Sequence, residues 1–486
     1  MFAIEYYCPR CKEGHSGRFF KIPDNVDLSK FAEAQTRWQA IKSKFVPDEE
    51  IPTGVETDRL HRWGYRYYQE MFNYRQLLGL ELSCRIISEQ TDQRIMNALA
   101  TNLSDLLRYQ NMLCRYDTMA LKSLDIFSVH GFPVGLVQCE SNILGIFNGK
   151  RGTTVGSGGW LNIINKFIKA KSYCEYPFEV RYQGGRKIQI PIRGEWIGDK
   201  KNCNLSQDNR LVELYCKNAI EVELPSGSID AVLTDPPYYG NVQYAELMDF
   251  CYVWLRRLVG DRDPAFLKLS TRDHDELTGN NNMGRGLDHF TEGLSAVFQR
   301  MAKALKPGSP MAFTYHHNTI DAYFPVAVAI LDSGLTCSAS IPCPAEMGAS
   351  IHISGTQSSI IDTVFVCRST GKIPRRWIAD SPEGIAHLVA EDIEKLQAGD
   401  IKPTQGDIRC IIFGQLIRLA IWFLRKGWDI NCTSQEKLKI MSNWMEKMGG
   451  LKTVQDHLGE IFSDLPSRQG MIVREKEQSY DFEISF

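Results

Sequence analysis

The sequence predicts an α/β fold in which a doubly wound sheet is flanked by helical segments. Residues 211–368 alternate between apolar runs short enough for strands and amphipathic stretches long enough for helices. Residues 26–128 and 371–486 instead carry apolar residues at spacings of three and four, which indicates helices. At 486 residues the chain is long enough for several domains with a large buried core.

Changes of pattern divide the chain into five expected domains. Residues 1–25 contain a paired-cysteine knuckle, and residues 26–128 are helical. Residues 129–210 form a mixed, basic insert, residues 211–370 the α/β region, and residues 371–486 a C-terminal helical domain.

The mixed insert contains several expected elements. Residues 134–139 and 143–147 are apolar enough for strands, and residues 156–171 indicate a glycine turn followed by a helix. Residues 178–192 have the alternation of a hairpin around Gly184 and Gly185.

The insert is also the one concentrated basic segment of the chain. Residues 166–201 hold nine Lys or Arg against four Asp or Glu, a net charge of 9 − 4 = +5, with aromatic residues between them. Arg181, Arg186 and Lys187 are therefore candidates to contact DNA phosphates. A solvated basic edge is the alternative interpretation.

The α/β region has an expected order of strand, helix, helix, strand, helix, strand, strand. Because no helix separates the last two strands, the sheet should end in an antiparallel pair. The expected strands are 229–235, 310–317, 335–343 and 360–368, and the expected helices are 244–259, 290–308 and 319–334.

Composition excludes some classes of protein. The formal net charge of −2 gives no overall basic field, so a nucleic-acid contact would need a local patch. The 14 cysteines are scattered and no secretory signal starts the sequence, which favours reduced thiols in a cytoplasmic protein. The longest apolar run, 411–424, is shorter than the ~20 residues of a membrane span, so we expect a core helix and no membrane partner.

An Asp-Pro-Pro-Tyr motif follows the strand expected at 229–235. Ligands of open α/β sheets bind beyond the carboxyl ends of the strands. There Asp235 and the backbone carbonyl of Pro236, stiffened by Pro237, could accept the two N–H groups of a planar amine. Tyr238 offers an aromatic face to an extruded base. A strand-terminating turn is the alternative.

These residues and their flanks carry a family resemblance. "SGSIDAVLTDPPYYGNVQYAELMDFCYVWLRRLVGD" resembles the amino-methyltransferases, and specifically the adenine-specific DNA methylases that contain a zinc ribbon. "RWGYRYYQEMFNYRQLLGLELS", "RYQNMLCRYD", "VGSGGWLNIINKFIKA" and "PAEMGASIHISGTQSSIIDTVFVCR" are similar to other segments of that family. The resemblance covers roughly residues 8–368.

The resemblance implies a partial Rossmann-like class I methyltransferase sheet and a specific activity. It implies methyl transfer from S-adenosylmethionine to adenine N6 in DNA, as in restriction, modification or phage-defence systems. Asp235, Pro236, Pro237 and Tyr238 match the catalytic motif, and Asn241 and Tyr244 match positions that face the substrate.

The cofactor half of such an enzyme is missing from the sequence pattern. The glycine-rich stretch at 153–160 follows a polar stretch rather than a buried strand, so a helix N-terminus that contacts a phosphate, or a tight turn, is the better interpretation. Asn218 and Ala219 are the remaining cofactor-binding candidates. The resemblance implies that the cofactor-binding strand and glycine loop lie in an N-terminal half or subunit, without which the chain is expected to be inactive.

Cys8, Cys11 and His15 are the candidate zinc ligands. A structural zinc site takes four ligands, and no second Cys-x-x-Cys pair occurs in the sequence. Any further ligand would come from another polypeptide or from upstream residues.

Several alternatives remain open at this stage. His316 and His317 end an expected strand and are candidates for a general base, although a hydrogen-bonded histidine is the simpler interpretation. The target could be cytosine N4 or RNA instead of adenine in DNA. A non-catalytic DNA-binding or scaffold remnant is the alternative to an enzyme.

Overall fold

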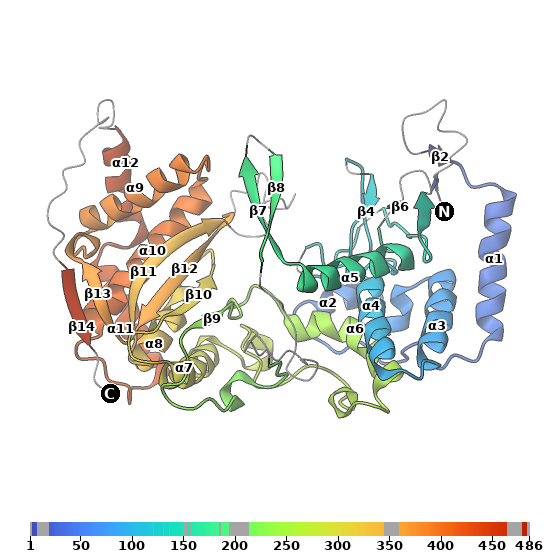
Figure 1. Cartoon of the computed structure of the whole chain (residues 1–486), viewed down its shortest axis with the longest axis horizontal. Helices are drawn as coiled ribbons and strands as arrows, with labels where there is room; N and C mark the ends of the chain where they lie inside the picture. Colours follow the sequence, from blue (N-terminus) through green and yellow to red (C-terminus); the bar gives the residue numbers. More distant parts are fainter. Residues whose placement is uncertain are drawn as a thin grey trace. The chain divides into compact units, whose positions relative to one another are not determined.

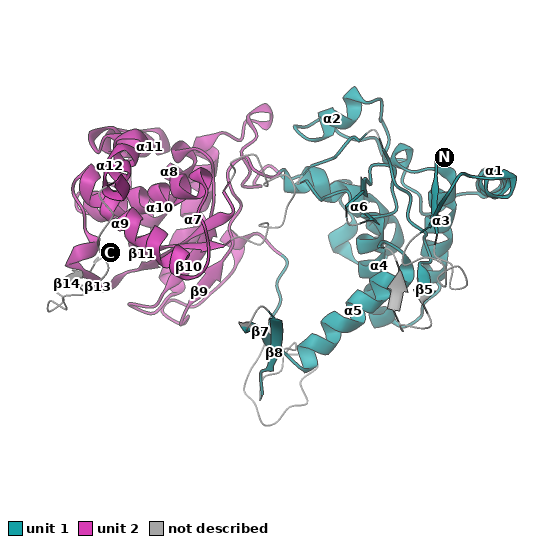
Figure 2. Ribbon diagram, turned by 90° about the horizontal axis from the view of Figure 1, so that it is seen from above, with its two compact units in different colours: residues 1–216, 243–273 teal, residues 217–242, 274–486 magenta. Residues whose placement is uncertain are grey.

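The computed structural model describes residues 2–6, 19–119, 121–129, 131–135, 137–148, 153–155, 157–183, 186–193, 213–344, 359–463 and 479–483. They belong to two compact units, which Figure 2 colours separately. Unit 1 consists of Met1–Cys216 and Gln243–Asp273, and unit 2 of Lys217–Val242 and His274–Phe486. Each unit has its own set of buried apolar side chains.

Unit 2 is built on a four-stranded mixed sheet with the strand order β11-β12-β10-β9 (Figure 1). β9 (Val232–Thr234) runs parallel to β10 (Met311–Tyr315). β12 (Ile361–Arg368) runs antiparallel to both β10 and β11 (Thr336–Pro344). The predicted α/β class and the antiparallel ending are therefore confirmed.

One face of this sheet is buried more completely than the other. Met311, Phe313 and Tyr315 of β10 are at most 1% exposed, whereas Ala312 and Thr314 between them are only partly buried. The buried face packs against helices, as the 5.0 Å between the rings of Phe298 and Phe313 illustrates. A doubly wound sheet is covered on both faces. Among the described residues, therefore, only one face of the sheet is fully buried, whereas the expected doubly wound sheet has both faces covered.

The C-terminal helices pack directly on the sheet and share its core, although the sequence suggested a separate domain. α10 (Gln405–Leu424) is buried from Cys410 to Trp422 and contacts β11 and β12. A Cβ atom on Gly414 would lie 2.5 Å from Ser340 Oγ, so this close approach requires glycine. The apolar run at 411–424 is thus a core helix, as predicted. The other helices of unit 2 are α7 (Leu287–Ala304), α8 (Phe324–Asp332), α9 (Pro382–Ala398), α11 (Ser434–Lys447) and α12 (Gly450–Ser463).

Unit 1 is mainly helical, as its sequence periodicity predicts. Its core includes Phe72, whose ring stacks on Phe250 at 5.7 Å and meets Trp254 edge-on at 5.3 Å. Phe250 and Trp254 belong to α6 (Tyr244–Val259), so this helix groups with unit 1 rather than with the sheet. The other helices of unit 1 are α1 (Asn25–Ala40), α2 (Thr57–Arg62), α3 (Tyr74–Ser88), α4 (Gln93–Leu107) and α5 (Trp160–Glu175).

A buried carboxylate explains how α6 holds α2. Glu246 is 2% exposed and accepts hydrogen bonds from the backbone N–H groups of Val55, Glu56 and Thr57. These are orphan donors at the start of α2, and a negative charge is favourable there. Gly54 leaves room for the carboxylate, because a Cβ atom would lie 2.4 Å from it.

Some predicted elements of the mixed insert differ from the structure. The expected strand at 134–139 was wrong: its described residues contain only an isolated bridge between Gln138 and Arg115. Pro133 and Gly135 explain this, because proline lacks an N–H donor and glycine weakens a strand. The strand expected at 143–147 is reduced to β5 (Ile146–Asn148).

The predicted hairpin is present as β7 (Phe178–Gln183) and β8 (Arg186–Pro191). Its turn residues, Gly184 and Gly185, lie outside the described residues. Among the described helices, none combines the length and the apolar character needed to cross a membrane. The remaining short elements are β1 (Ile4–Tyr6), β2 (Phe19–Lys21), β3 (Tyr116–Asp117), β4 (Lys122–Ser123), β6 (Thr153–Val155), β13 (Thr370–Pro374), β14 (Ser479–Glu483), and the 3-10 helices η2 (Tyr68–Met71), η3 (Ala219–Glu221), η4 (Pro264–Phe266), η5 (Asn281–Met283), η6 (Ile320–Tyr323) and η8 (Arg375–Trp377).

Candidate active site

Asp235 is the first residue after β9, at the carboxyl end of the parallel pair β9–β10. Because parallel strands end at the same edge of a sheet, this position lies beside Thr314 and Tyr315, the last residues of β10. Thr314 Oγ1 donates a hydrogen bond to Asp235 Oδ1. Asp235 thus occupies the strand-end position at which ligands of open α/β sheets bind.

The Asp235 carboxylate uses only one of its oxygens within the described residues. Thr314 Oγ1 and the Tyr238 hydroxyl, at 3.1 Å, both donate to Oδ1. Asp235 is exposed, and none of the described residues donates a hydrogen bond to its Oδ2. An ionised carboxylate has about four lone-pair sites. Asp235 can therefore accept further N–H donors from a ligand.

The Tyr238 ring is partly buried beside the motif. Its centroid lies 5.2 Å from that of Tyr315, with 57° between the ring planes. Burial raises the pKa of the Tyr238 phenol, so the hydroxyl stays protonated and donates to Asp235 at neutral pH. The sequence predicts an open aromatic face for a base. In the structure only the exposed part of this ring is available for such contact.

The buried Tyr315 and the partly buried Tyr239 hold the loop that contains the motif. The backbone N–H of Tyr239 donates to the Tyr315 hydroxyl at 3.4 Å, and that hydroxyl donates to the carbonyl of Ala322 at 2.7 Å. The Tyr239 ring packs edge-on against Phe290, with 5.4 Å between centroids. The loop is therefore fixed to β10 and α7 as well as stiffened by its two prolines, of which Pro236 is buried.

The described hydrogen bonds of His316 are to Asn241 and Cys410, and none is to the Asp235 carboxylate. The His316 carbonyl accepts a 3.4 Å hydrogen bond from Asn241 Nδ2, and its Nδ1 lies 3.6 Å from Cys410 Sγ on α10. Burial lowers the pKa of His316 and of His317, so both are neutral near pH 7. Asn241 is thus held beside the motif, and these contacts favour a structural role for His316.

The cofactor-binding candidates do not form a nucleotide site within the described residues. Asn218 caps η3, and its side-chain oxygen accepts from the N–H of Ile220 at 3.1 Å. Ala219 is the first residue of that short helix and is exposed. The Asn218 amide oxygen is therefore already engaged in its own turn.

The glycine turn before α5 serves packing within unit 1. Gly158 has φ +79°, and a Cβ atom there would lie 2.1 Å from Tyr109 Cβ. A Cβ atom on Gly159 would lie 2.5 Å from the backbone of Gly145. Gln110 Nε2 also donates to the carbonyl of Gly158 at 2.6 Å. These contacts account for both glycines without a bound phosphate.

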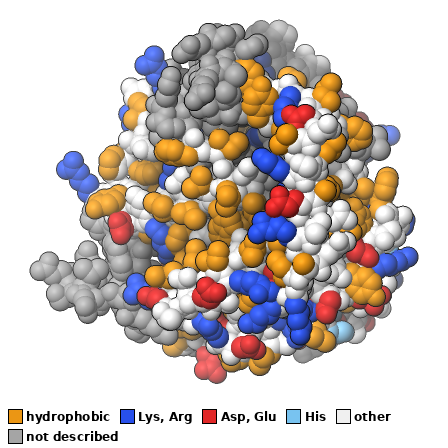
Figure 3. Space-filling view, turned by 90° about the vertical axis from the view of Figure 1, so that its right-hand side faces the viewer, with side chains coloured by type: hydrophobic (Ala, Val, Ile, Leu, Met, Phe, Trp, Pro, Cys, Tyr) orange, Lys and Arg blue, Asp and Glu red, His pale blue; other side chains and the backbone are white. Residues whose placement is uncertain are grey.

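The remaining substrate-binding candidates lie in unit 1. Arg181, Arg186 and Lys187 are exposed on the β7–β8 hairpin. Tyr244 begins α6 and is 43% exposed. On the face drawn in Figure 3, basic, acidic and apolar side chains are intermixed. A contact of the hairpin with DNA phosphates would depend on its individual basic side chains.

The candidate zinc ligands, Cys8, Cys11 and His15, lie outside the described residues. β1 and β2 pair with each other on either side of that segment. In the part of the chain that the structure describes, no group of three or more His, Cys, Asp or Glu side chains is arranged to hold a metal ion.

Comparisons with known proteins add no relative. No family model, no curated protein and no solved structure matches this chain.

Three further residues of this site were not singled out from the sequence. Thr314 and Tyr315 support the motif from β10, and Cys410 contacts His316 from α10. The first two carried a usable signal, because they end a predicted strand that should lie parallel to β9. Cys410 carried none, because it lies 94 residues from His316 in the sequence.

Proposed function

We propose that this chain is the target-base half of a DNA methyltransferase that modifies the N6 amine of adenine. The observation that carries the proposal is the exposed Asp235 carboxylate at the carboxyl end of β9, with Oδ2 open to a ligand. The position of Tyr238 beside it, together with the resemblance described above, points to a planar amine as that ligand.

The chain's own residues bind and polarise the amine. The exocyclic amine of adenine has two N–H groups, which Asp235 Oδ2 and the backbone carbonyl of Pro236 accept. Two such hydrogen bonds increase the electron density on nitrogen and fix its orientation. Asp235 is exposed, so a ligand can reach its carboxylate directly. This scheme requires no covalent enzyme intermediate.

The target base has to leave the DNA helix to reach this carboxylate. Extrusion costs a few kcal/mol, and contact with an aromatic side chain offsets part of it, about 1–3 kcal/mol per base. The exposed part of the Tyr238 ring is the surface for this contact. The Tyr238 hydroxyl is hydrogen-bonded to Asp235 and so fixes the orientation of the carboxylate. A base that contacts the Tyr238 ring therefore meets a carboxylate that is already oriented.

The described residues do not fit S-adenosylmethionine, so we assign the methyl donor to a separate cofactor-binding half. The Asn218 amide oxygen is engaged in its own turn, and Gly158 and Gly159 are explained by packing. The outer edge of β9 supports this assignment, because it has no strand partner among the described residues. Leu233 on that strand is 78% exposed, and apolar edge strands are normally covered.

The β7–β8 hairpin supports DNA as the polymer that carries the base. Every residue of β8 is exposed, and the hairpin presents Arg181, Arg186 and Lys187. Such side chains contribute affinity through phosphates without reading the sequence. We propose adenine N6 rather than cytosine N4 as the target, and DNA rather than RNA, only because of the family resemblance.

A non-catalytic DNA-binding scaffold is the second candidate. The bond from the Tyr238 hydroxyl to Asp235 favours it, because the carboxylate is already partly satisfied without a substrate. The two functions differ in one measurable respect, since only the enzyme needs the charge of Asp235.

The test is transfer of a tritiated methyl group from S-adenosylmethionine to unmethylated genomic DNA. The protein is purified from its native cells with any bound polypeptide retained. We expect Asp235→Ala to reduce incorporation by about 10²–10³-fold, as for loss of one oriented polar group in an active site. Asp380→Ala, which removes another exposed carboxylate of unit 2, should leave incorporation unchanged. Equal incorporation by the wild-type protein and Asp235→Ala would contradict the proposal.

A further inference from the structure

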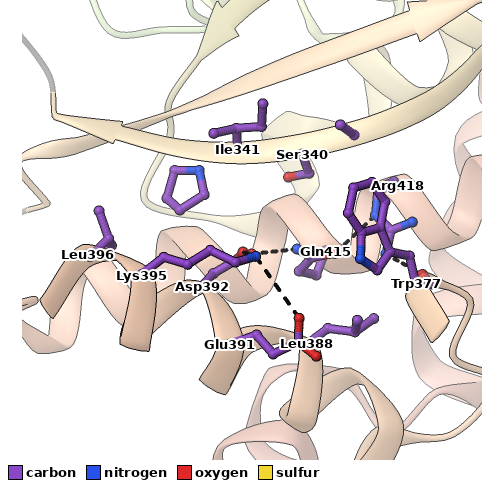
Figure 4. Close-up of a pocket in the computed structure, with 12 residues that line it drawn as sticks. Ser340, Ile341, Trp377, Leu388, Glu391, Asp392, Lys395, Leu396, Gln415 and Arg418 are labelled. Carbon is purple, nitrogen blue, oxygen red and sulfur yellow. Dashed lines mark hydrogen bonds and ion pairs between the residues drawn. The ribbon is translucent and has the colours of Figure 1, made fainter. Parts of the chain in front are cut away.

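A cavity of about 310 Å³ lies in unit 2 between β11, α9 and α10 (Figure 4). None of its lining residues belongs to the Asp-Pro-Pro-Tyr loop or to β10, so it is separate from the candidate active site. Its volume is at the lower end of the ~300–1,000 Å³ typical of small-molecule sites. The cavity is therefore large enough for one ring-sized ligand.

Arg418 lines this cavity and is unusually poorly paired for a buried cation. Its side chain is 2% exposed, yet no carboxylate of the described residues lies within ion-pair distance of it. Nε donates to Gln415 Oε1 at 3.0 Å, and Nη2 donates to the carbonyl of Trp377 at 2.5 Å. Nη1 is buried without a hydrogen-bond partner. An unmatched buried donor of this kind is costly and rare in folded proteins.

The nearest buried carboxylate is directed elsewhere. Asp392 accepts hydrogen bonds from Gln415 Nε2 at 2.6 Å and from Lys395 Nζ at 3.2 Å (Figure 4). Gln415 thus links Asp392 to Arg418, because its Nε2 donates to Asp392 and its Oε1 accepts from Arg418 Nε. Turning the amide over would direct its NH₂ group toward Arg418, so this rotation does not supply an acceptor to Nη1.

The charges around the cavity favour a neutral ligand. The charged side chains that line the cavity sum to zero: Arg418 and Lys395 are positive, and Glu391 and Asp392, which pairs with Lys395 at 3.2 Å, are negative. An added carboxylate would leave one uncompensated negative charge beside Asp392, which is unfavourable at low dielectric. A carbonyl oxygen would satisfy Nη1 without changing the charge.

The rest of the wall suits a flat apolar body. Pro342, Trp377 and Leu388 line the cavity, and Ser340, on the same side of β11 as Pro342, adds a hydroxyl. Pockets that bind small molecules have this character, with apolar walls and a few polar groups that set orientation.

We propose that this cavity binds a small neutral molecule that places a carbonyl oxygen on Arg418 Nη1 and a flat apolar ring between β11 and α9. This site is independent of the proposed methyl transfer, since it uses none of the same residues.

Three probes that share one ring separate the possible ligand classes: benzamide carries a neutral carbonyl, benzoate a carboxylate, and aniline no oxygen acceptor. Binding to the intact chain is followed by saturation-transfer NMR. We expect saturable binding of benzamide with a dissociation constant on the order of 1 mM, which is ordinary for a fragment of this size. Benzoate and aniline should bind at least about tenfold more weakly, the ratio expected for loss of one well-placed hydrogen bond.

Two variants locate the binding. Pro342→Trp fills the cavity from β11, because Pro342 is partly buried on the same side of the strand as Ser340, and it leaves the contacts of Arg418 in place. Ile430→Trp is the control, because Ile430 is 50% exposed in unit 2 and does not line the cavity. Arg418→Met removes the donor, and its thermal melt shows whether the core survives.

The expected result is loss of benzamide binding in Pro342→Trp and in folded Arg418→Met, with Ile430→Trp unchanged. Three results would overturn the proposal: no saturable binding of benzamide, binding that Pro342→Trp leaves intact, or benzoate binding more tightly than benzamide.

Discussion

Asp407 offers a sharp test of how unit 2 is held together. This fully buried carboxylate accepts from Ser359 Oγ and the N–H of Ile360, both at 2.8 Å, next to the start of β12. It also accepts from the N–H and the hydroxyl of Thr404 at 2.7 and 2.8 Å, where α10 begins. Asp407 therefore joins the first turn of α10 to the strand beside the candidate active site.

Replacing Asp407 should destabilise unit 2 strongly. Asp407→Ala leaves two backbone N–H groups without an acceptor, and each costs about 1–3 kcal/mol, so we expect a loss of about 4 kcal/mol. Asp407→Asn keeps one oxygen, and if this oxygen faces Ser359 and Ile360, only the Thr404 side loses its acceptor. We therefore expect about half that loss for Asp407→Asn. A loss of 4 kcal/mol is a large part of the ~5–15 kcal/mol that stabilises a typical domain.

Hydrogen exchange measured by mass spectrometry checks this locally. A loss of about 4 kcal/mol should speed exchange of peptides from α10 and β12 by about 10³-fold where exchange follows global opening. Glu394→Ala, which removes an exposed carboxylate from α9, serves as the control and should leave these rates unchanged. Wild-type exchange rates in Asp407→Ala would refute the assigned role of this carboxylate.

Three further predictions follow from single residues. Gly158→Ala should lower the melting temperature of unit 1, because alanine is strained at φ +79° and meets Tyr109; a melt unchanged from wild type would count against this packing. Leu233→Lys should leave the isolated chain folded, since this side chain is 78% exposed, but should reduce methyl transfer if a cofactor half covers β9; full transfer by this variant argues against that docking. Burial lowers the pKa of His316, so below pH ~6.5 the unfolded chain binds the proton more readily and stability falls as pH falls. His316→Gln should weaken that fall in a series of melts between about pH 5 and 7.5, and an identical pH profile would contradict it.

Local patterns were sufficient to predict most of the sheet. β10 and β12 alternate buried and partly buried residues, which is the signal that periodicity detects. β11 and β12 follow each other without an intervening helix, which predicted their antiparallel pairing. The Asp235 position followed from the same logic, since a motif after an apolar strand must lie at the sheet's edge.

Long-range packing explains what sequence patterns missed. α6 has the periodicity of any amphipathic helix, and nothing local shows that Glu246 caps α2, about 190 residues earlier in the chain. The sequence suggested that the C-terminal helices form a separate domain. Gly414 lets α10 approach β11 closely, but this role is visible only in the structure, where Ser340 lies opposite it. Likewise, the poorly paired state of Arg418 depends on where Gln415 and Asp392 point.

Nucleoside mass spectrometry of the treated DNA tests the central claim most directly. DNA incubated with S-adenosylmethionine and the native complex is digested, and methylated nucleosides are quantified for the wild-type protein and for Asp235→Asn, which keeps the shape of the side chain but removes its charge. The account predicts N6-methyladenosine in its deoxy form with the wild-type protein and about 10²-fold less with the variant. Equal amounts from both proteins, or methylation at cytosine alone, would contradict it.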